Sequence, residues 1–252
     1  MGKIIAVANQ KGGVGKTTTS VNLCYGLKQA GKNVLLCDTD PQGNSTTSMG
    51  VSKNKITAGT YQALSGGAIE DCIVQTPYGD LLPSNAQLSG AAVELVGVKQ
   101  REFVLKNALA KIKDKYDYII VDCPPSLELL TLNSLCAADS LLIPVQCEYF
   151  ALEGLSDLMT TVRLIKKRLN PDLEIEGVLM TMYDNRTNLS IQVTEAVKKF
   201  FRDKVYKVVI PRAVRISEAP SHGKPIMAYD RSCRGARAYN ELALEVISRN
   251  GG

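Results

Sequence analysis

Long hydrophobic runs are missing from this sequence of 252 residues, and no apolar segment approaches the roughly 20 residues needed to span a bilayer. An apolar leader is also missing, because Met1, Gly2 and Lys3 run directly into the first short apolar segment. These two absences argue against a membrane-spanning protein and against a secretory precursor. We therefore expect a soluble protein of the cytoplasm.

Cysteine pairs and histidine are also scarce. Seven cysteines occur, but none forms a CxxC pair, and several lie inside or beside apolar runs, where free cysteine behaves as a small hydrophobe. The chain therefore lacks the cysteine arrangement of proteins that carry a metal cluster. His222 is the only histidine and lies in a basic loop, so we expect acid–base chemistry to come from carboxylates.

Positive charge, by contrast, is concentrated in one region. Residues 198–237 contain eleven Lys or Arg and three Asp or Glu, a local net charge of +8 that leaves −3 for the rest of a chain with net charge +5. Such a polarised distribution favours a polyanionic partner, of which nucleic acid is the commonest. A solvated basic surface without a partner is the alternative.

Short apolar runs alternate with longer amphipathic segments, a pattern typical of βαβ units around a parallel sheet. Runs such as YIIVD and LLIPV are apolar on both faces, as expected for strands covered by helices on each side. We predict a single α/β domain over residues 1–252, with a doubly wound, mostly parallel sheet flanked by helices. Residues 45–90 are weakly patterned and should hold short helices and loops. Strands are expected at 4–8, 33–37, 118–122, 141–145, 175–182 and 205–210, and helices at 17–30, 94–112, 152–169, 189–201 and 236–248.

A glycine-rich loop, residues 10–17, follows the first expected strand and indicates a P-loop nucleotide-binding site. Its glycines lack a Cβ and let backbone amides turn toward an oxyanion at the N-terminal end of the next helix. Lys16 can neutralise the β- and γ-phosphates of ATP, and the Thr17 hydroxyl can ligate Mg²⁺. We assign nucleotide binding to Lys11, Gly12, Gly13, Val14, Gly15, Lys16, Thr17 and Thr18.

This loop departs from the GxxxxGK[ST] pattern, because Gln10 stands at the position of the first glycine and Lys11 precedes the glycine pair. A solvated loop lysine is the ordinary alternative for Lys11. The form KGGVGKTT resembles the deviant Walker A loop of the ParA/MinD ATPases. The resemblance implies an ATP-controlled sandwich dimer in which Lys11 contacts the nucleotide of the partner subunit and acts together with Lys16 in catalysis.

Three aspartates after expected strands complete the predicted site. Asp38 and Asp40 lie two residues apart, so an extended segment would place both carboxylates on one side. Asp122 ends an apolar strand, as a Walker B carboxylate does. Thr17, Asp38 and Asp122 are the candidates for supporting the metal, and the resemblance assigns Asp40 to activation of the attacking water. Aspartates that only cap turns are the alternative for the first two.

The resemblance to the chromosomal ParA, or Soj, branch of this family extends over nearly the whole chain. It includes PVQCEYFALEGL at 144–155, GVLMTMYDNRTNLS at 177–190 and IPRAVRISEAPSHGKPI at 210–226. It implies that Met182 and Pro211 border the adenine, although Ala213 departs from the asparagine common in relatives.

The same resemblance implies that ATP-bound dimers hold double-stranded DNA without sequence preference through Arg186 and Arg215. Lys198, Lys199 and Arg202 follow on an expected helix whose apolar positions leave a basic edge exposed. Because no base-reading helix is evident, we expect contacts to phosphates. The implied role is partitioning of a chromosome or plasmid by a nucleoid-associated protein, with a ParB-like centromere-binding partner that stimulates hydrolysis.

Three other functions remain open from the sequence. A MinD-type division-site ATPase would bind the membrane through its last helix, but Glu241 and Glu245 give that helix an acidic face that suits anionic lipid badly, so no membrane partner is expected. A nucleotide-gated regulator of a replication initiator would share all of the motifs above. A kinase or synthetase that transfers phosphate to a small molecule would need an acceptor pocket, which the sequence does not indicate.

Overall fold

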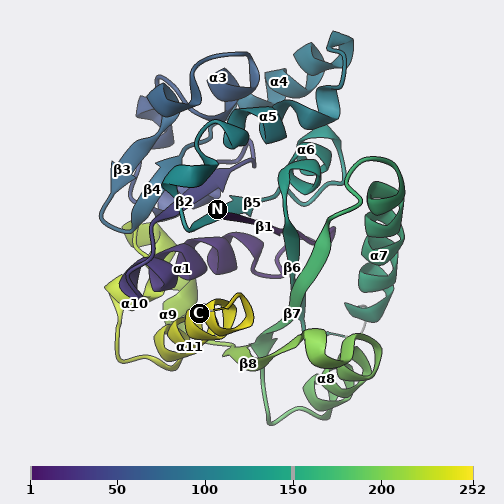
Figure 1. The fold of residues 1–252 in the computed structure, drawn as a ribbon. Coiled ribbons are helices and arrows are strands. Elements are labelled where there is room, and N and C mark those ends of the chain that lie inside the picture. Colours follow the sequence, from purple (N-terminus) through teal and green to yellow (C-terminus); the bar gives the residue numbers. More distant parts are fainter. Residues whose placement is uncertain (1, 149–150, 252) are drawn as a thin grey trace.

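The computed structural model describes residues 2–148 and 151–251, which form one eight-stranded sheet with helices on both faces (Figure 1). The strand order is β3-β4-β2-β5-β1-β6-β7-β8. Neighbouring strands are parallel except for β3 and β4, which are antiparallel. The predicted fold class is therefore confirmed.

The strands are short at the β3 edge of the sheet and longer toward the β8 edge. They are β1 (Lys3–Val7), β2 (Val34–Asp38), β3 (Val74–Thr76), β4 (Gly79–Leu82), β5 (Tyr118–Asp122), β6 (Ser140–Gln146), β7 (Glu174–Tyr183) and β8 (Val205–Pro211). The helices are α1 (Lys16–Gln29), α2 (Asn44–Ser48), α3 (Thr60–Leu64), α4 (Leu88–Glu94), α5 (Val104–Ala110), α6 (Leu129–Ala137), α7 (Ala151–Arg168), α8 (Asn188–Phe201), α9 (Val214–Glu218), α10 (Ile226–Tyr229) and α11 (Arg234–Arg249).

Two hydrophobic cores lie on opposite faces of the sheet. Along β1, Ile4 and Ala6 belong to the core shared with α3 to α8, whereas Ile5 and Val7 belong to the core shared with α1, α10 and α11. Successive side chains of a strand point to opposite faces, so a strand covered on both sides must be apolar throughout. This explains why the central strands read as continuous apolar runs. Within the described residues, no helix is both long and apolar enough to cross a membrane.

The prediction of one helix over residues 94–112 is wrong. Helix α4 ends at Glu94, a 3₁₀ turn follows at Leu95–Gly97, and Gln100 adopts a left-handed φ of 55° before α5 begins. The break leaves Val96 63% exposed, so the apolar residues there do not form one buried face. The weakly patterned segment also contains the β3 and β4 hairpin, which the sequence analysis did not predict. Helix α6 was likewise not predicted.

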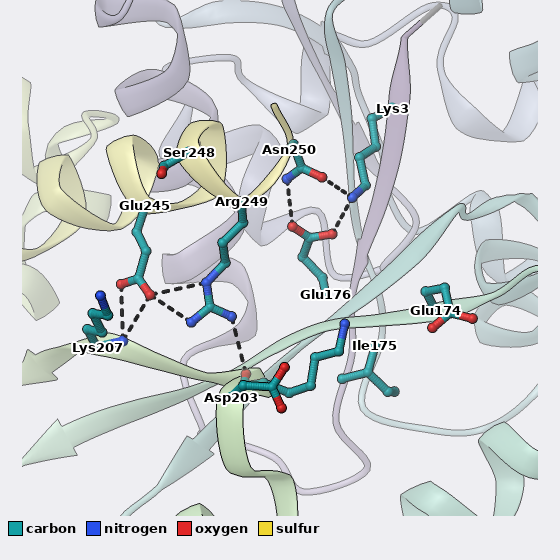
Figure 2. A pocket seen from close by; sticks show the side chains of 11 residues that line it. Lys3, Glu174, Ile175, Glu176, Asp203, Lys207, Glu245, Ser248, Arg249 and Asn250 are labelled. Atoms are coloured by element: carbon teal, nitrogen blue, oxygen red, sulfur yellow. Dashed lines mark hydrogen bonds and ion pairs between the residues drawn. The ribbon is translucent and has the colours of Figure 1, made fainter. Parts of the chain in front are cut away.

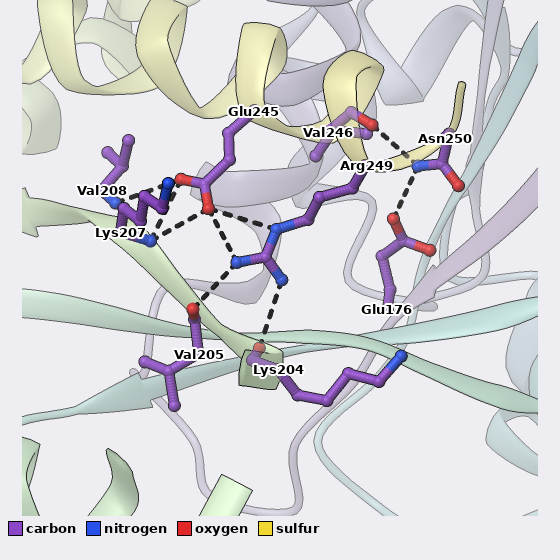
Figure 3. Close-up of polar contacts among 9 residues, drawn as sticks. All are labelled: Glu176, Lys204, Val205, Lys207, Val208, Glu245, Val246, Arg249 and Asn250. Carbon is purple, nitrogen blue, oxygen red and sulfur yellow. Dashed lines mark hydrogen bonds and ion pairs between the residues drawn. The ribbon is translucent and has the colours of Figure 1, made fainter. Parts of the chain in front are cut away.

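Side chains of α11 bond to backbone groups of β8, the edge strand of the sheet. The Glu245 carboxylate accepts hydrogen bonds from the amides of Lys207 at 3.0 Å and Val208 at 3.2 Å (Figure 3). Arg249 donates to the Val205 carbonyl at 2.8 Å and to Glu245 at 2.7 Å. Exposed strand edges invite pairing with other chains, and here the helix satisfies part of that edge. Lys207, Glu245 and Arg249 also border a charged cavity of about 530 Å³ at the amino ends of the strands, where Lys3 pairs with Glu176 (Figure 2).

Replacing Glu245 with alanine is expected to lower the free energy of unfolding by about 1–2 kcal/mol, because two strand amides and Arg249 lose their acceptor. Urea unfolding followed by circular dichroism measures the change. Glu241→Ala, at an exposed position of the same helix, is the matched control and should change stability little. Equal losses in both variants would show that the contacts to β8 contribute nothing.

Candidate nucleotide-binding site

The glycine-rich loop joins the carboxyl end of β1 to the start of α1, the place where ligands collect in parallel α/β sheets (Figure 1). Gly13 and Gly15 adopt left-handed φ values of 74° and 90°, which strain any residue with a Cβ. A Cβ placed on Gly12 or Gly13 would meet no other atom within 4 Å. The loop therefore leaves open space beside its backbone, as a phosphate cradle requires.

A cavity of about 360 Å³ lies against this loop. It collects predicted residues from the loop, from the segment after β2 and from the end of β7. Gln42, Asn44 and Pro125 also border it, and the sequence analysis did not assign them to the site. The lining consists of Gly12, Gly13, Gly15, Lys16, Thr17, Thr18, Asp40, Gln42, Asn44, Pro125 and Met182.

Lys16 is a buried cation at the base of this cavity. The residue is 7% exposed, and its ammonium donates to the Lys11 carbonyl at 2.9 Å. Burial lowers the pKa of Lys16, and the carboxylates of Asp122 and Asp40 partly oppose that shift. An anion in the cavity would favour the charged ammonium, so the position fits a bound phosphate.

Asp122 lies beneath the loop, fully buried and saturated with hydroxyl donors. Its Oδ2 accepts from Thr17 at 2.9 Å and from Ser45 at 2.5 Å, and its Oδ1 accepts from Ser20 at 2.9 Å. The carboxylate and the Thr17 hydroxyl are therefore in contact, and hard oxygen donors of this kind suit Mg²⁺. These residues would hold the metal when it is bound.

Asp38 is also fully buried, but its carboxylate is directed to α2. It accepts hydrogen bonds from the amide and the hydroxyl of Thr46 at 2.8 and 2.7 Å, and from the Asp40 amide at 3.1 Å. Asp38 therefore holds the start of α2 and does not border the cavity. Ser20, Ser45 and Thr46 were not assigned to the site from the sequence, although the hydroxyl-rich run NSTTS at 44–48 was a signal for Ser45 and Thr46.

Both buried aspartates are costly to ionise in the absence of a cation. Burial raises the pKa of Asp38 to about 7, and the nearby charge of Asp122 adds to the effect. Burial also raises the pKa of Asp122 to about 6, against the opposing effect of its three hydroxyl donors. Their folded pKa values exceed the unfolded value, so the native state binds more protons between about pH 4 and pH 7. The stability that this pair contributes is therefore lost as the pH rises through that window.

The variant Asp38→Asn is expected to flatten this pH dependence. From pH 5 to pH 8, the free energy of unfolding of the nucleotide-free wild type should fall by roughly 2 kcal/mol more than that of the variant. The reason is that the variant has only one of the two buried acids left to ionise. Urea unfolding at both pH values measures the difference, whatever the absolute stability of the variant. Asp71→Asn, at an exposed position, is the control. An unchanged difference in Asp38→Asn would contradict the expectation.

Asp40 and Met182 border the cavity from opposite sides of the loop. Asp40 is 8% exposed, and its Oδ1 accepts from the Gln42 amide at 2.9 Å, which fixes the orientation of the carboxylate. Met182 adopts a left-handed φ of 50°, a conformation that costs free energy in a residue other than glycine.

Two other predicted nucleotide-binding residues do not border the cavity. Pro211 ends β8 beside Tyr183. Val14 is buried, and its carbonyl accepts from the Thr181 hydroxyl.

Lys11 lies outside the cavity that its own loop forms. Its ammonium bonds to Glu148 at 2.8 Å, and the two side chains are 35% and 49% exposed. A surface ion pair of this kind contributes between about 0 and 1 kcal/mol, so it holds Lys11 only weakly. The ammonium is therefore available to an anion outside its own chain's cavity.

The five candidate DNA contacts fall into separate groups. Arg186 lies just before α8 and forms a bidentate pair with Asp184, at 2.9 and 2.8 Å. Arg215 lies on α9 and pairs with Glu218 at 3.0 Å. The exposed residues Lys198, Lys199 and Arg202 lie at the opposite end of α8, about 20 Å from its start given the rise of an α-helix. The structure therefore does not bring all five together in one chain.

Comparisons with known proteins agree with this geometry. A family model described as an AAA domain matches residues 2–175. The sporulation initiation inhibitor protein Soj of Bacillus subtilis is 61% identical over 98% of this chain and 99% of the relative. The chromosome partitioning protein ParA of Myxococcus xanthus is 50% identical over 99% of this chain and 89% of the relative. A solved structure of cobyrinic acid a,c-diamide synthase from Mycobacterium smegmatis, with an ATP analogue and magnesium bound, is 37% identical with a TM-score of 0.90, covering 100% of this chain and 96% of that one.

Proposed function

Because this chain belongs to the Soj/ParA family of chromosome-partitioning ATPases, we propose that it dimerises around ATP, binds DNA without sequence preference and partitions a chromosome or plasmid. Its activity is hydrolysis of ATP to ADP and phosphate, and its cofactors are ATP and Mg²⁺, as predicted from the sequence. A ParB-like centromere-binding protein is the proposed partner that stimulates turnover. The proposed location is the cytoplasm, in association with the nucleoid.

The position of Lys11 is the observation that best supports the dimer. Its ammonium pairs with Glu148, and neither residue borders the cavity that Lys16 lines. In a dimer with two-fold symmetry, Lys11 could contact the γ-phosphate of the ATP that is bound to the other subunit. Each nucleotide site would then be completed by the partner subunit. Lys16 and Lys11 would stabilise the charge of the transferring phosphoryl group, while Asp40 orients the attacking water. A monomer lacks the Lys11 of a partner subunit, so we propose that ATP turnover by monomers is slow.

DNA binding is proposed for Arg186 and Arg215, which follow the carboxyl ends of the neighbouring parallel strands β7 and β8. Both arginines already pair with acids of their own chain, so DNA phosphates must compete with Asp184 and Glu218. Dimerisation doubles the number of cations on one surface, and this would make DNA affinity depend on ATP and fall steeply with salt.

Size-exclusion chromatography and DNA co-sedimentation with ATP or ADP test the proposal. We expect dimers and DNA binding with ATP, and loss of most DNA binding in Arg186→Glu and Arg215→Glu. Lys115→Glu makes the same charge change at an exposed position on another part of the molecule and should retain DNA. Monomers in every nucleotide state, or full DNA retention by both arginine variants, would remove the corresponding part of the proposal.

The alternative functions predict different results. In α11 the apolar residues Tyr239, Leu242 and Val246 are buried in the core and Leu244 is exposed, which is too little apolar surface on this helix for a membrane-binding face. Sedimentation with anionic liposomes would reveal a MinD-type activity. A replication initiator is a second candidate partner, favoured if turnover does not respond to a DNA-bound ParB-like protein. A product other than ADP and phosphate would indicate a synthetase or kinase.

A further inference from the structure

We propose that α2 couples the metal side of the nucleotide site to the segment that carries Arg215. The first turn of this short helix contacts the metal side of the site, and its other end contacts the 3₁₀ turn that continues from α9, the helix of Arg215. This inference rests on the proposed function, since it states how nucleotide would change the affinity for DNA.

The first turn of α2 is tied to both buried carboxylates of the site. Ser45 donates to Asp122 at 2.5 Å, and Thr46 donates to Asp38 through its amide and its hydroxyl. Ser45 shares the Oδ2 atom of Asp122 with the Thr17 hydroxyl. A cation held by Thr17 and Asp122 would compete with these hydroxyl donors for the carboxylate, so its arrival would alter the bond to Ser45. The start of α2 therefore responds to occupation of the metal site.

The other end of α2 packs against the segment that follows α9. Gly50 and Gly223 have left-handed φ values of 81° and 61°, and their backbones touch without intervening side chains. A Cβ on Gly223 would lie 3.0 Å from the Gly50 Cα and 3.4 Å from the Thr47 carbonyl oxygen. Gly223 follows a 3₁₀ turn at Ala219–His222 that continues directly from α9. Because α2 is only five residues long, it can transmit a shift of its first turn to this contact.

Arg215 is held by partners on both sides of that contact. Its guanidinium bonds to Glu218 at 3.0 Å on α9 and lies 3.7 Å from Asp230, which follows α10. The start of α10 is fixed to the phosphate-binding helix, because the Ile226 amide donates to Asn22 of α1 at 2.7 Å. Movement at Gly223 would therefore change the position of α9 relative to α10. Such movement redistributes Arg215 between its own acids and an incoming phosphate.

Gly223→Ala tests this coupling, because the added methyl group must push α2 and the 3₁₀ turn apart. The measurement is the ratio of the DNA dissociation constants in ADP and in ATP, with the affinity for a fluorescent ATP analogue as a second readout. We expect the ratio to fall at least about fivefold, within the usual range of allosteric coupling, while ATP affinity changes less than about twofold. Gly31→Ala is the matched control, since Gly31 also has a φ of 81° but a Cβ there would meet no atom within 4 Å.

Hydrogen exchange of the wild type provides evidence that does not depend on the variant folding. Addition of Mg²⁺ and ATP should change amide exchange both at residues 45–50 and at residues 219–223. The inference is overturned if the second segment does not respond, or if a folded Gly223→Ala keeps the wild-type ratio. Failure of the wild type to bind DNA more tightly with ATP would instead overturn the proposed function, and the coupling with it.

Discussion

Asp40→Ala is expected to slow ATP hydrolysis by roughly 10²–10³-fold while ATP still binds, the effect of removing a group that positions or deprotonates the attacking water. The carboxylate borders the cavity, and the Gln42 amide orients it. The glycine-rich loop, Lys16 and Thr17 are untouched by the change, so phosphate binding should remain. Steady-state phosphate release and equilibrium ATP binding measure the two properties separately.

The same variant should also accumulate dimers. If hydrolysis separates the subunits, a protein that binds ATP and does not hydrolyse it remains in the dimeric state, which size-exclusion chromatography with ATP detects. Asp40→Asn keeps an oxygen that can accept from the Gln42 amide and removes only the charge, so it distinguishes loss of the carboxylate from loss of the local turn. Turnover near the wild-type rate in either variant would exclude Asp40 as the group that activates water.

The parts of this site that the sequence predicted well are local in the chain. The glycine-rich loop needs only a run of consecutive residues, since Gly13 and Gly15 supply left-handed conformations and Lys16 and Thr17 begin the following helix. The strands were predictable for a similar reason, because a strand covered on both faces must be apolar along its whole length.

The contacts that were not predicted join residues far apart in the sequence. Ser45 and Asp122 are separated by 77 positions, and Lys11 and Glu148 by 137. No local pattern marks such pairs, because the folding of the sheet brings them together. The direction of Asp38 shows the same limit. Spacing placed it beside Asp40, but the hydroxyl and amide of Thr46 orient its carboxylate toward α2.

Lys11→Ala is expected to abolish most turnover, by roughly 10²-fold or more, because a cation near the transferring phosphoryl group is lost. ATP binding to the monomer should persist, since Lys11 does not border its own cavity. Dimers with ATP should be absent or much weakened. Glu148→Gln is the informative control, because it breaks the same exposed ion pair from the other side and leaves the cation in place. If the two variants behaved alike, the ion pair and not the lysine would be what matters.

Mixing Lys11→Ala with Asp40→Ala decides whether Lys11 acts on its own nucleotide or on the partner's. In a mixed dimer that exchanges Lys11 across the interface, the Lys11→Ala subunit keeps its own Asp40 and receives Lys11 from its partner, which makes one complete site. The other site lacks both groups. The upper limit is about one quarter of wild-type turnover, which random pairing would give with about half of the dimers mixed and one complete site in each. We expect a smaller but measurable rate, because Asp40→Ala subunits form stable dimers with one another. If Lys11 served its own nucleotide, every site would lack one group and the mixture would stay inactive. The measured rate at equal concentrations of the two variants therefore separates the two arrangements.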